Sequence, residues 1–108
     1  MTFDEYQAWC LTKWKTDNSY INQLLECALG LGESGEAQDI VKKFVFHSHD
    51  LDEGGLQKEL GDMMYYISIM CALTGVSLSD IIKINVDKLN TRYPNGFESE
   101  RSINRGEG

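Results

Sequence analysis

The sequence predicts an all-α protein, and three observations support this fold class. Apolar residues recur at intervals of three and four along most of the chain, and no segment shows the apolar–polar alternation of a half-buried strand. The 108 residues contain a single proline, Pro94. The length predicts one domain over residues 1–108, and turn-forming residues divide it into four helical stretches. We therefore expect a four-helix type of bundle.

The first two stretches lie in the N-terminal half of the chain. Helical spacing of aromatic and other apolar side chains predicts a first helix over Asp4–Lys15, which the polar residues 16–19 end. The second stretch runs from about Tyr20 to His47. Three glycines interrupt it, at Gly30, Gly32 and Gly35. Because each costs about 1 kcal/mol relative to alanine inside a helix, they indicate either a kink or break, or the close approach of a neighbouring helix or ligand.

A third helix is expected from about Asp52 or Leu56 to Thr74. Apolar side chains return along it at helical intervals. Gly75 follows directly and is placed to cap its C-terminal end, since glycine readily adopts the left-handed conformation of a helix stop.

The fourth helix begins where residues 77–80 resemble a capping box that starts with Ser77. Pro94 prevents it from extending beyond about Arg92, because the residue before a proline is disfavoured in the helical conformation. Residues 95–108 are polar and contain glycine, which is typical of a loop or tail. The core of the domain is thus expected within about residues 20–93.

Composition limits the classes of partner. Seventeen acidic and ten basic residues leave a formal charge of -7, so we expect no DNA or RNA partner. No apolar run approaches the roughly 18 residues that span a bilayer, and residues 1–5 lack the features of a secretory signal. Three cysteines without CxxC spacing indicate reduced thiols. We therefore expect a cytoplasmic protein with no membrane partner.

Four carboxylates fall on stripes that helical periodicity assigns to apolar faces. Glu33 and Glu36 share a stripe of the second stretch with Leu29, and Glu59 and Asp62 interrupt a similar stripe of the third. Ionised carboxylates without partners are costly to bury, and the bases on these stripes are too few to pair with all four. A hard divalent cation resolves this, because residues at i and i+3 point the same way. The pattern predicts a Mg²⁺ site, with Mn²⁺ as a possible substitute.

Other metal sites fit the pattern less well. A single ExxE pair occurs by chance on many surface helices, whereas two such pairs on apolar stripes are specific in combination. Zinc is disfavoured because His47 and His49 lie off these stripes and no cysteine joins them. A di-iron carboxylate protein for redox or storage would require Glu-x-x-His motifs.

Further candidate residues complement the acidic groups. Lys88 and Arg92 share one side of the fourth helix with Asn85, and the two bases could hold the phosphates of a polyphosphate ligand. The alternative is that the two bases only extend along apolar surface near a helix C-terminus. Tyr66, one turn from Asp62, could stack on a base or sugar or belong to the core. Two aromatic residues, Trp9 and Trp14, are most simply packing residues, with a nucleobase pocket as the alternative.

Three segments resemble the MazG-like nucleotide pyrophosphohydrolases of the all-α NTP pyrophosphohydrolase superfamily. They are residues 30–37 (GLGESGEA), 59–66 (ELGDMMYY) and 85–97 (NVDKLNTRYPNGF). The resemblance covers roughly residues 20–105. It implies a Mg²⁺-dependent enzyme that cleaves nucleoside triphosphates to the monophosphate and pyrophosphate. Some relatives have a further acid where this chain has Gly32, which bears on whether a third metal binds.

The resemblance also implies roles for individual residues. The metal ligands would be Glu33, Glu36, Glu59 and Asp62. The residues that help to hold metal-bound water or phosphates would be Asn85, Lys88 and Arg92. We expect a metal-activated water to attack the α-phosphorus of an NTP or dNTP, with Glu33 as a candidate general base.

Self-association is a further expectation. Apolar side chains lie on more than one side of the third helix, at Met64, Ile67 and Ile69, and relatives are dimers or tetramers with sites near subunit interfaces. Three other readings stay open: a phosphoribosyl-ATP pyrophosphohydrolase-like enzyme, a non-catalytic helical interaction module, and the redox or storage protein.

Overall fold

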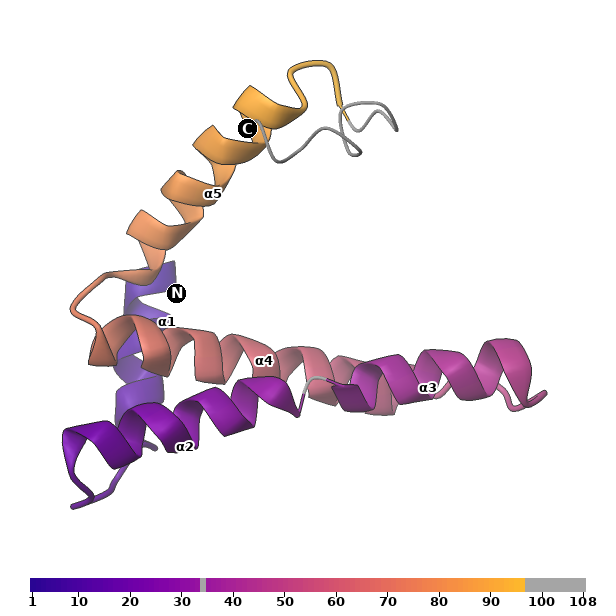
Figure 1. The fold of residues 1–108 in the computed structure, drawn as a ribbon, viewed down its shortest axis with the longest axis horizontal. Coiled ribbons are helices and arrows are strands. Elements are labelled where there is room, and N and C mark those ends of the chain that lie inside the picture. Colours follow the sequence, from indigo (N-terminus) through magenta and orange to yellow (C-terminus); the bar gives the residue numbers. More distant parts are fainter. Residues whose placement is uncertain (34, 97–108) are drawn as a thin grey trace.

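The computed structural model describes residues 1–33 and 35–96, and in this part of the chain it has five helices and no strand (Figure 1). The helices are α1 (Phe3–Leu11), α2 (Tyr20–Gly32), α3 (Gly35–Phe46), α4 (Glu53–Leu73) and α5 (Leu78–Arg92). The all-α prediction is confirmed. All four predicted helical stretches are present, with the second divided into α2 and α3.

Helix α1 is shorter than predicted. Thr2 caps its N-terminus in a capping box with Glu5, in which each side chain bonds to the backbone N–H of the other. The helix ends at Leu11 instead of Lys15, because the Thr12 hydroxyl donates to the carbonyl of Trp9 at 2.6 Å. A threonine hydroxyl that bonds to the local backbone competes with continued helix formation.

The second predicted stretch breaks beside its glycines. Glu33 is the C-cap of α2, and its N–H donates to the carbonyls of Leu29 and Gly30, both at 3.2 Å. Gly32 ends α2 and Gly35 begins α3, and a Cβ at either would meet nothing within 4 Å. The helix thus breaks beside these two glycines, which agrees with one of the two interpretations left open by the sequence.

The remaining helix ends agree closely with the sequence. The Asp52 side chain accepts from the N–H of Gly55 at 3.0 Å, and α4 then runs to Leu73. Gly75 has φ +77°, as a left-handed helix stop requires. Ser77 accepts from the N–H of Asp80 at 3.1 Å and so opens α5. The tail expected over residues 95–108 lies almost wholly outside the described residues.

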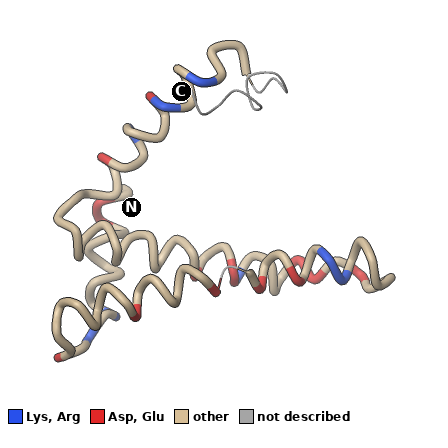
Figure 2. The backbone as a smooth tube through the Cα atoms, viewed as in Figure 1, with Lys and Arg blue, Asp and Glu red and all other residues tan. Residues whose placement is uncertain are grey.

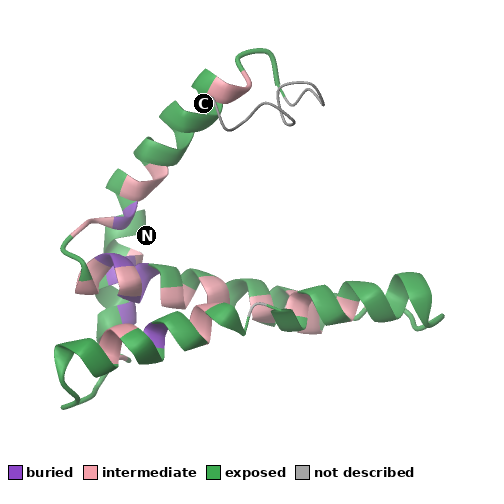
Figure 3. Ribbon diagram, viewed as in Figure 1, coloured by how far each residue is buried: buried purple, intermediate pink, exposed green. Residues whose placement is uncertain are grey.

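The buried core is small and lies where α1, α2 and α4 cross (Figure 3). Cys10, Cys27 and Ile69 are fully buried there. By contrast, α3 has no buried residue and forms an arm with the N-terminal half of α4. Phe44 and Phe46 on this arm are 49% and 76% exposed. The apolar stripe of α3 is therefore only partly covered in the single chain.

Helix α5 turns away from the other helices after α4. The side chain of Gln7 on α1 holds the turn, because it donates to the carbonyl of Val76 at 3.0 Å and accepts from the N–H of Leu78 at 2.8 Å. Within the described residues no single helix is both long and apolar enough to cross a bilayer; α4 and α5 together meet these criteria, bent by 104°. The C-terminal half of α5, which carries Lys88 and Arg92, is directed away from α4 (Figure 1).

Candidate active site

One small pocket collects the four acidic side chains singled out by the sequence. Its volume is about 50 Å³. It lies where the chain passes from α2 to α3 alongside α4, and Figure 2 shows acidic positions on these facing stretches. The lining residues are Gly30, Glu33, Glu36, Glu59, Asp62, Met63 and Tyr66. The structure therefore brings together side chains from three helices.

The break between α2 and α3 places the first acidic pair. Glu33 is the C-cap of α2, whereas Glu36 lies in the first turn of α3. The pair therefore does not lie on one continuous helix, which is how the stripe pattern had placed it. The N–H of Glu36 donates to the carbonyl of Glu33 at 2.9 Å and keeps the two residues one turn apart. A carboxylate in the first turn of a helix is favoured by the helix dipole. The pair thus keeps its expected spacing across the break.

The carboxylates are more exposed than the stripe pattern predicted. Glu59 is half-buried, whereas Glu33, Glu36 and Asp62 are exposed. The reason is that neighbouring apolar side chains on the same stripe are themselves uncovered in the single chain, with Leu29 63% exposed. Burial of all four acids is therefore not a property of the isolated protomer.

The electrostatics of the pocket are dominated by like charge. The pKa of Glu59 is raised above its ordinary value, first by a hydrogen bond with Glu36, then by partial burial and by repulsion from Glu36, Asp62 and Glu33. None of the residues described as lining the pocket is basic. The pocket is therefore short of positive charge.

The donor chemistry of the pocket fits a hard divalent cation. Its acidic lining offers carboxylate oxygens and no imidazole or thiolate, which is the donor set that Mg²⁺ and Mn²⁺ prefer. In the arrangement seen here, no three acidic, histidine or cysteine side chains of the described residues converge on a single metal position. Side-chain rotation would be required to bring the oxygens together.

Tyr66 forms one wall of the pocket, beside the acids. Its ring lies against Gly30, where a Cβ would collide with it. The thiol of Cys27 donates to the Tyr66 carbonyl at 3.2 Å. Burial raises the pKa of the Tyr66 phenol, and the nearby charges of Glu33 and Asp62 raise it further. At Gly30, therefore, the other interpretation of the glycines applies, since a side chain of a neighbouring helix approaches the backbone closely.

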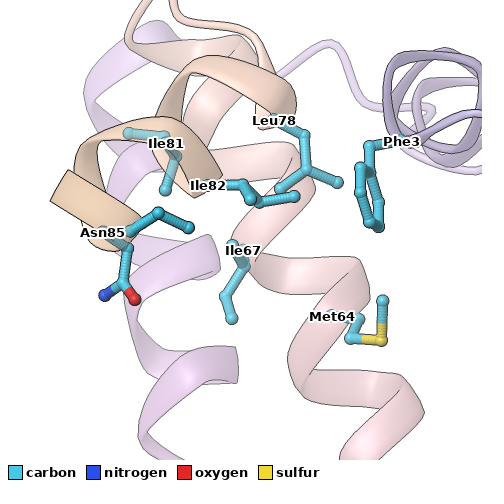
Figure 4. Close-up of a pocket in the computed structure, with 8 residues that line it drawn as sticks. Phe3, Met64, Ile67, Leu78, Ile81, Ile82 and Asn85 are labelled. Carbon is cyan, nitrogen blue, oxygen red and sulfur yellow. The ribbon is translucent and has the colours of Figure 1, made fainter. Parts of the chain in front are cut away.

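The three candidates on α5 do not reach the acidic pocket of their own chain. Asn85 borders a different, apolar pocket of about 300 Å³ between α1, α4 and α5, shown in Figure 4. Lys88 is exposed and Arg92 half-buried toward the C-terminal end of α5, and neither lines the acidic pocket. The apolar pocket is lined by Phe3, Met64, Ile67, Leu78, Ile81, Ile82, Asn85 and Val86.

A third pocket adjoins the acidic one and contains Trp14, for which the sequence left open either a packing role or a nucleobase pocket. Its volume is about 240 Å³, and Tyr66 lines both pockets. Its other lining residues are Lys13, Trp14, Lys15, Thr16, Glu26 and Tyr65. The signal in the sequence was the aromatic residue between two lysines at positions 13–15. Of the two tryptophans, Trp14 lines this pocket, whereas Trp9 does not.

Comparison with known proteins supports the resemblance drawn from the motifs. The family model described as the MazG nucleotide pyrophosphohydrolase domain matches residues 19–97. The Gene 37 protein of Mycobacterium phage L5 is 32% identical over 94 residues, which cover 82% of each chain. No solved structure matches. The matched residues include the helices that form the acidic pocket and all of α5.

Proposed function

The chain belongs to the MazG nucleotide pyrophosphohydrolase family, and from this membership we propose that it hydrolyses an NTP or dNTP to the monophosphate and pyrophosphate in a Mg²⁺-dependent reaction. The observation that carries the proposal is the gathering of Glu33, Glu36, Glu59 and Asp62 around one pocket. One pair comes from the C-cap of α2 and the first turn of α3 and the other from α4, so the meeting of the two pairs is a result of the fold.

The four carboxylates are the proposed ligands of Mg²⁺, which Mn²⁺ could replace. When bound, the metal would offset their charge, bind phosphate oxygens of the substrate and lower the pKa of a water molecule. The raised pKa of Glu59, caused first by its hydrogen bond with Glu36 and then by partial burial and the neighbouring carboxylates, supports this role, because it places these acidic groups close together.

The proposed reaction is attack of water on the α-phosphorus. The water oxygen forms a bond to phosphorus, the bond between the α-phosphorus and the bridging oxygen breaks, and that electron pair leaves with pyrophosphate. Glu33 accepts the proton of the attacking water. Glu33 lies at the C-cap of α2, is exposed and lines the pocket, and it is the carboxylate that we propose for this role.

The phosphates need positive charge that the acidic pocket lacks. Lys88 and Arg92 are the proposed source of that charge, with Asn85 as a neutral hydrogen-bond partner, and Arg92 can grip a phosphate through two hydrogen bonds. Because α5 leaves the pocket of its own chain, we propose that a second copy in a dimer or tetramer presents these residues. Tyr66 is proposed to contact the substrate beside the metal.

Pyrophosphate release tests the function directly. Wild-type protein is incubated with each NTP and dNTP in Mg²⁺ or in EDTA, and pyrophosphate is measured separately from phosphate. We expect Mg²⁺-dependent pyrophosphate from at least one nucleotide. Glu36→Ala and Asp62→Asn should each reduce the rate by about 10³-fold, since both geometry and charge compensation are lost.

Asp39→Asn is the matched control, because Asp39 lies on α3 outside the pocket and should leave the rate unchanged. Near-normal rates in the Glu36 and Asp62 variants would contradict the assignment of these ligands. The absence of pyrophosphate with every nucleotide would favour a non-catalytic interaction module.

A further inference from the structure

The pocket beside the acidic site has a composition suited to a nucleoside. Its 240 Å³ make it about five times as large as the 50 Å³ acidic pocket, and the two meet at Tyr66. A triphosphate held at the carboxylates would therefore have its sugar and base within reach of the larger pocket. Aromatic faces are available there on Trp14 and Tyr65.

The indole of Trp14 is held in a defined orientation. Its Nε1–H donates to the Gln23 side chain at 3.0 Å, and Gln23 in turn donates to the carbonyl of Asn18 at 2.8 Å. The rings of Trp14 and Tyr65 have centroids 6.4 Å apart and are tilted by 55°. A half-buried, oriented aromatic ring can stack on a planar base, which contributes about 1–3 kcal/mol per base.

The polar lining provides both hydrogen-bond acceptors and donors. The carboxylate of Glu26 only accepts, whereas the amines of Lys13 and Lys15 only donate. Glu26 accepts from the Asn18 side chain at 3.3 Å, which orients it, and it lines the same pocket as Tyr65 and Tyr66. The carboxylate therefore lies close to the aromatic walls.

Resting on the function proposed above, we propose that this pocket binds the nucleoside part of the substrate. Trp14 stacks on the base, and Glu26 accepts a hydrogen bond from its exocyclic amino group. Cytosine and adenine carry such a group beside a ring acceptor, whereas uracil and thymine present carbonyl oxygens at the corresponding position. The enzyme thus favours cytosine and adenine over uracil and thymine.

The test uses free nucleosides, which need neither metal nor phosphate contacts. The wild-type protein has two tryptophans and so gives two indole N–H signals in a ¹⁵N–¹H NMR spectrum. Trp14→Phe and Trp9→Phe assign them. In EDTA, cytidine and adenosine should shift the Trp14 signal, with affinity about tenfold higher than that of uridine and thymidine, as expected for one hydrogen bond to a charged group.

Trp9 is the internal control. It is 47% exposed on α1, with Lys13 Nζ 5.5 Å from its ring centroid, and it lies outside the lining of the pocket. Its signal should move much less than that of Trp14. Equal movement of both signals, or no movement of the Trp14 signal, would overturn the inference.

Glu26→Gln tests the choice of base without disturbing the core, since Glu26 is exposed. An amide can also donate to a carbonyl, so this variant should lose the tenfold preference for cytidine over uridine. An unchanged preference would overturn the role of Glu26. Nucleoside binding without pyrophosphate release would reject the proposed function alone, whereas Mg²⁺-dependent release without nucleoside binding would reject the pocket alone.

Discussion

Gly30 shows how one absent side chain shapes the candidate site. The ring of Tyr66 occupies the space that a Cβ at this position would fill. Tyr66 in turn separates the acidic pocket from the larger one beside it. A glycine in the last turns of α2 costs helix stability, and this cost is offset by the close packing of an aromatic ring at the site.

Replacing Gly30 by alanine should therefore be destabilising. Overpacking costs about 1–3 kcal/mol, which exceeds the gain in helix propensity of about 1 kcal/mol. Gly61→Ala is the control, because Gly61 lies within α4 and a Cβ there would meet nothing within 4 Å. It should stabilise the chain by about 0.5–1 kcal/mol. Urea denaturation measures both, and equal effects would contradict the contact with Tyr66.

The protonation of Glu59 couples the acidic pocket to stability. Because the pKa of Glu59 is raised above 4.5 in the folded chain, the folded state holds the proton more tightly than the unfolded state. Its contribution to stability is greatest below pH 4.5 and is lost as the pH rises through the folded-state pKa. In EDTA, the wild-type Tm should therefore fall relative to that of Glu59→Gln between pH 4 and pH 7.

Addition of Mg²⁺ at pH 7 should reverse this difference. A cation that binds the folded state raises the Tm by mass action, and it should do so more for the wild type than for Glu59→Gln. Asp39→Asn, outside the pocket, should follow the wild type throughout. Parallel curves of Tm against pH for the wild type and Glu59→Gln would show that ionisation of Glu59 does not change the stability of the fold.

Among the helices, α1 holds the turn between α4 and α5 and so helps to orient α5. The Gln7 side chain is buried and bonds to the backbone on both sides of the turn between α4 and α5. At the surface, the Asp4 carboxylate accepts from both the N–H and the hydroxyl of Ser79, at 3.0 and 2.9 Å. Residues near the N-terminus thus determine where the phosphate-binding candidates on α5 point.

Gln7→Ala should weaken the contact between α1 and the turn that joins α4 to α5. It leaves buried backbone groups without their partner, at a cost of about 1–3 kcal/mol. The Leu78 amide should also lose protection in hydrogen exchange, because its N–H donates to Gln7 Oε1. Gln38→Ala, at an exposed position of α3, should change neither. Retained protection at Leu78 would show that the turn is held by other contacts.

At the scale of the molecule, the single chain is more extended than its length requires. Its radius of gyration is 16.9 Å, against about 13 Å for a compact domain of this size. Its accessible surface is 7979 Å², against about 6,100 Å² for a globular monomer of this mass. Uncovered apolar side chains on the α3 arm and around α5 contribute to this excess.

We expect the chain to form a dimer or tetramer that covers these surfaces, with light scattering giving a multiple of 12.2 kDa at micromolar concentration. If a second copy supplies the phosphate-binding residues, then mixing inactive Glu36→Ala and Arg92→Ala chains should restore part of the activity. Mixed oligomers contain sites in which both residues are intact. A stable monomer, or no recovery after mixing, would contradict a shared site.

Much of the local structure follows from the order of residues. Helix periodicity and the stop and start signals at Gly75, Ser77 and Pro94 predicted the ends of α4 and α5 to within a residue or a few. The spacing of the acids, read together with the motif on α5, predicted the family to which the chain belongs. These features depend on interactions between residues close together along the chain, which a linear pattern records directly.

Other features depend on which helices meet. The stripe pattern did not show that α2 and α3 separate at Glu33, that Gly30 receives the ring of Tyr66, or that Trp14 and Glu26 border a pocket next to the acids. Residues far apart in the sequence make these contacts, and many pairings of helices are compatible with the same apolar stripes. The sequence alone thus specified the helices and the chemical groups that they carry, whereas tertiary packing selected which groups share a pocket. The reason is that burial of apolar surface is favourable for any pairing of helices, so only shape and chain connectivity distinguish one pairing from another.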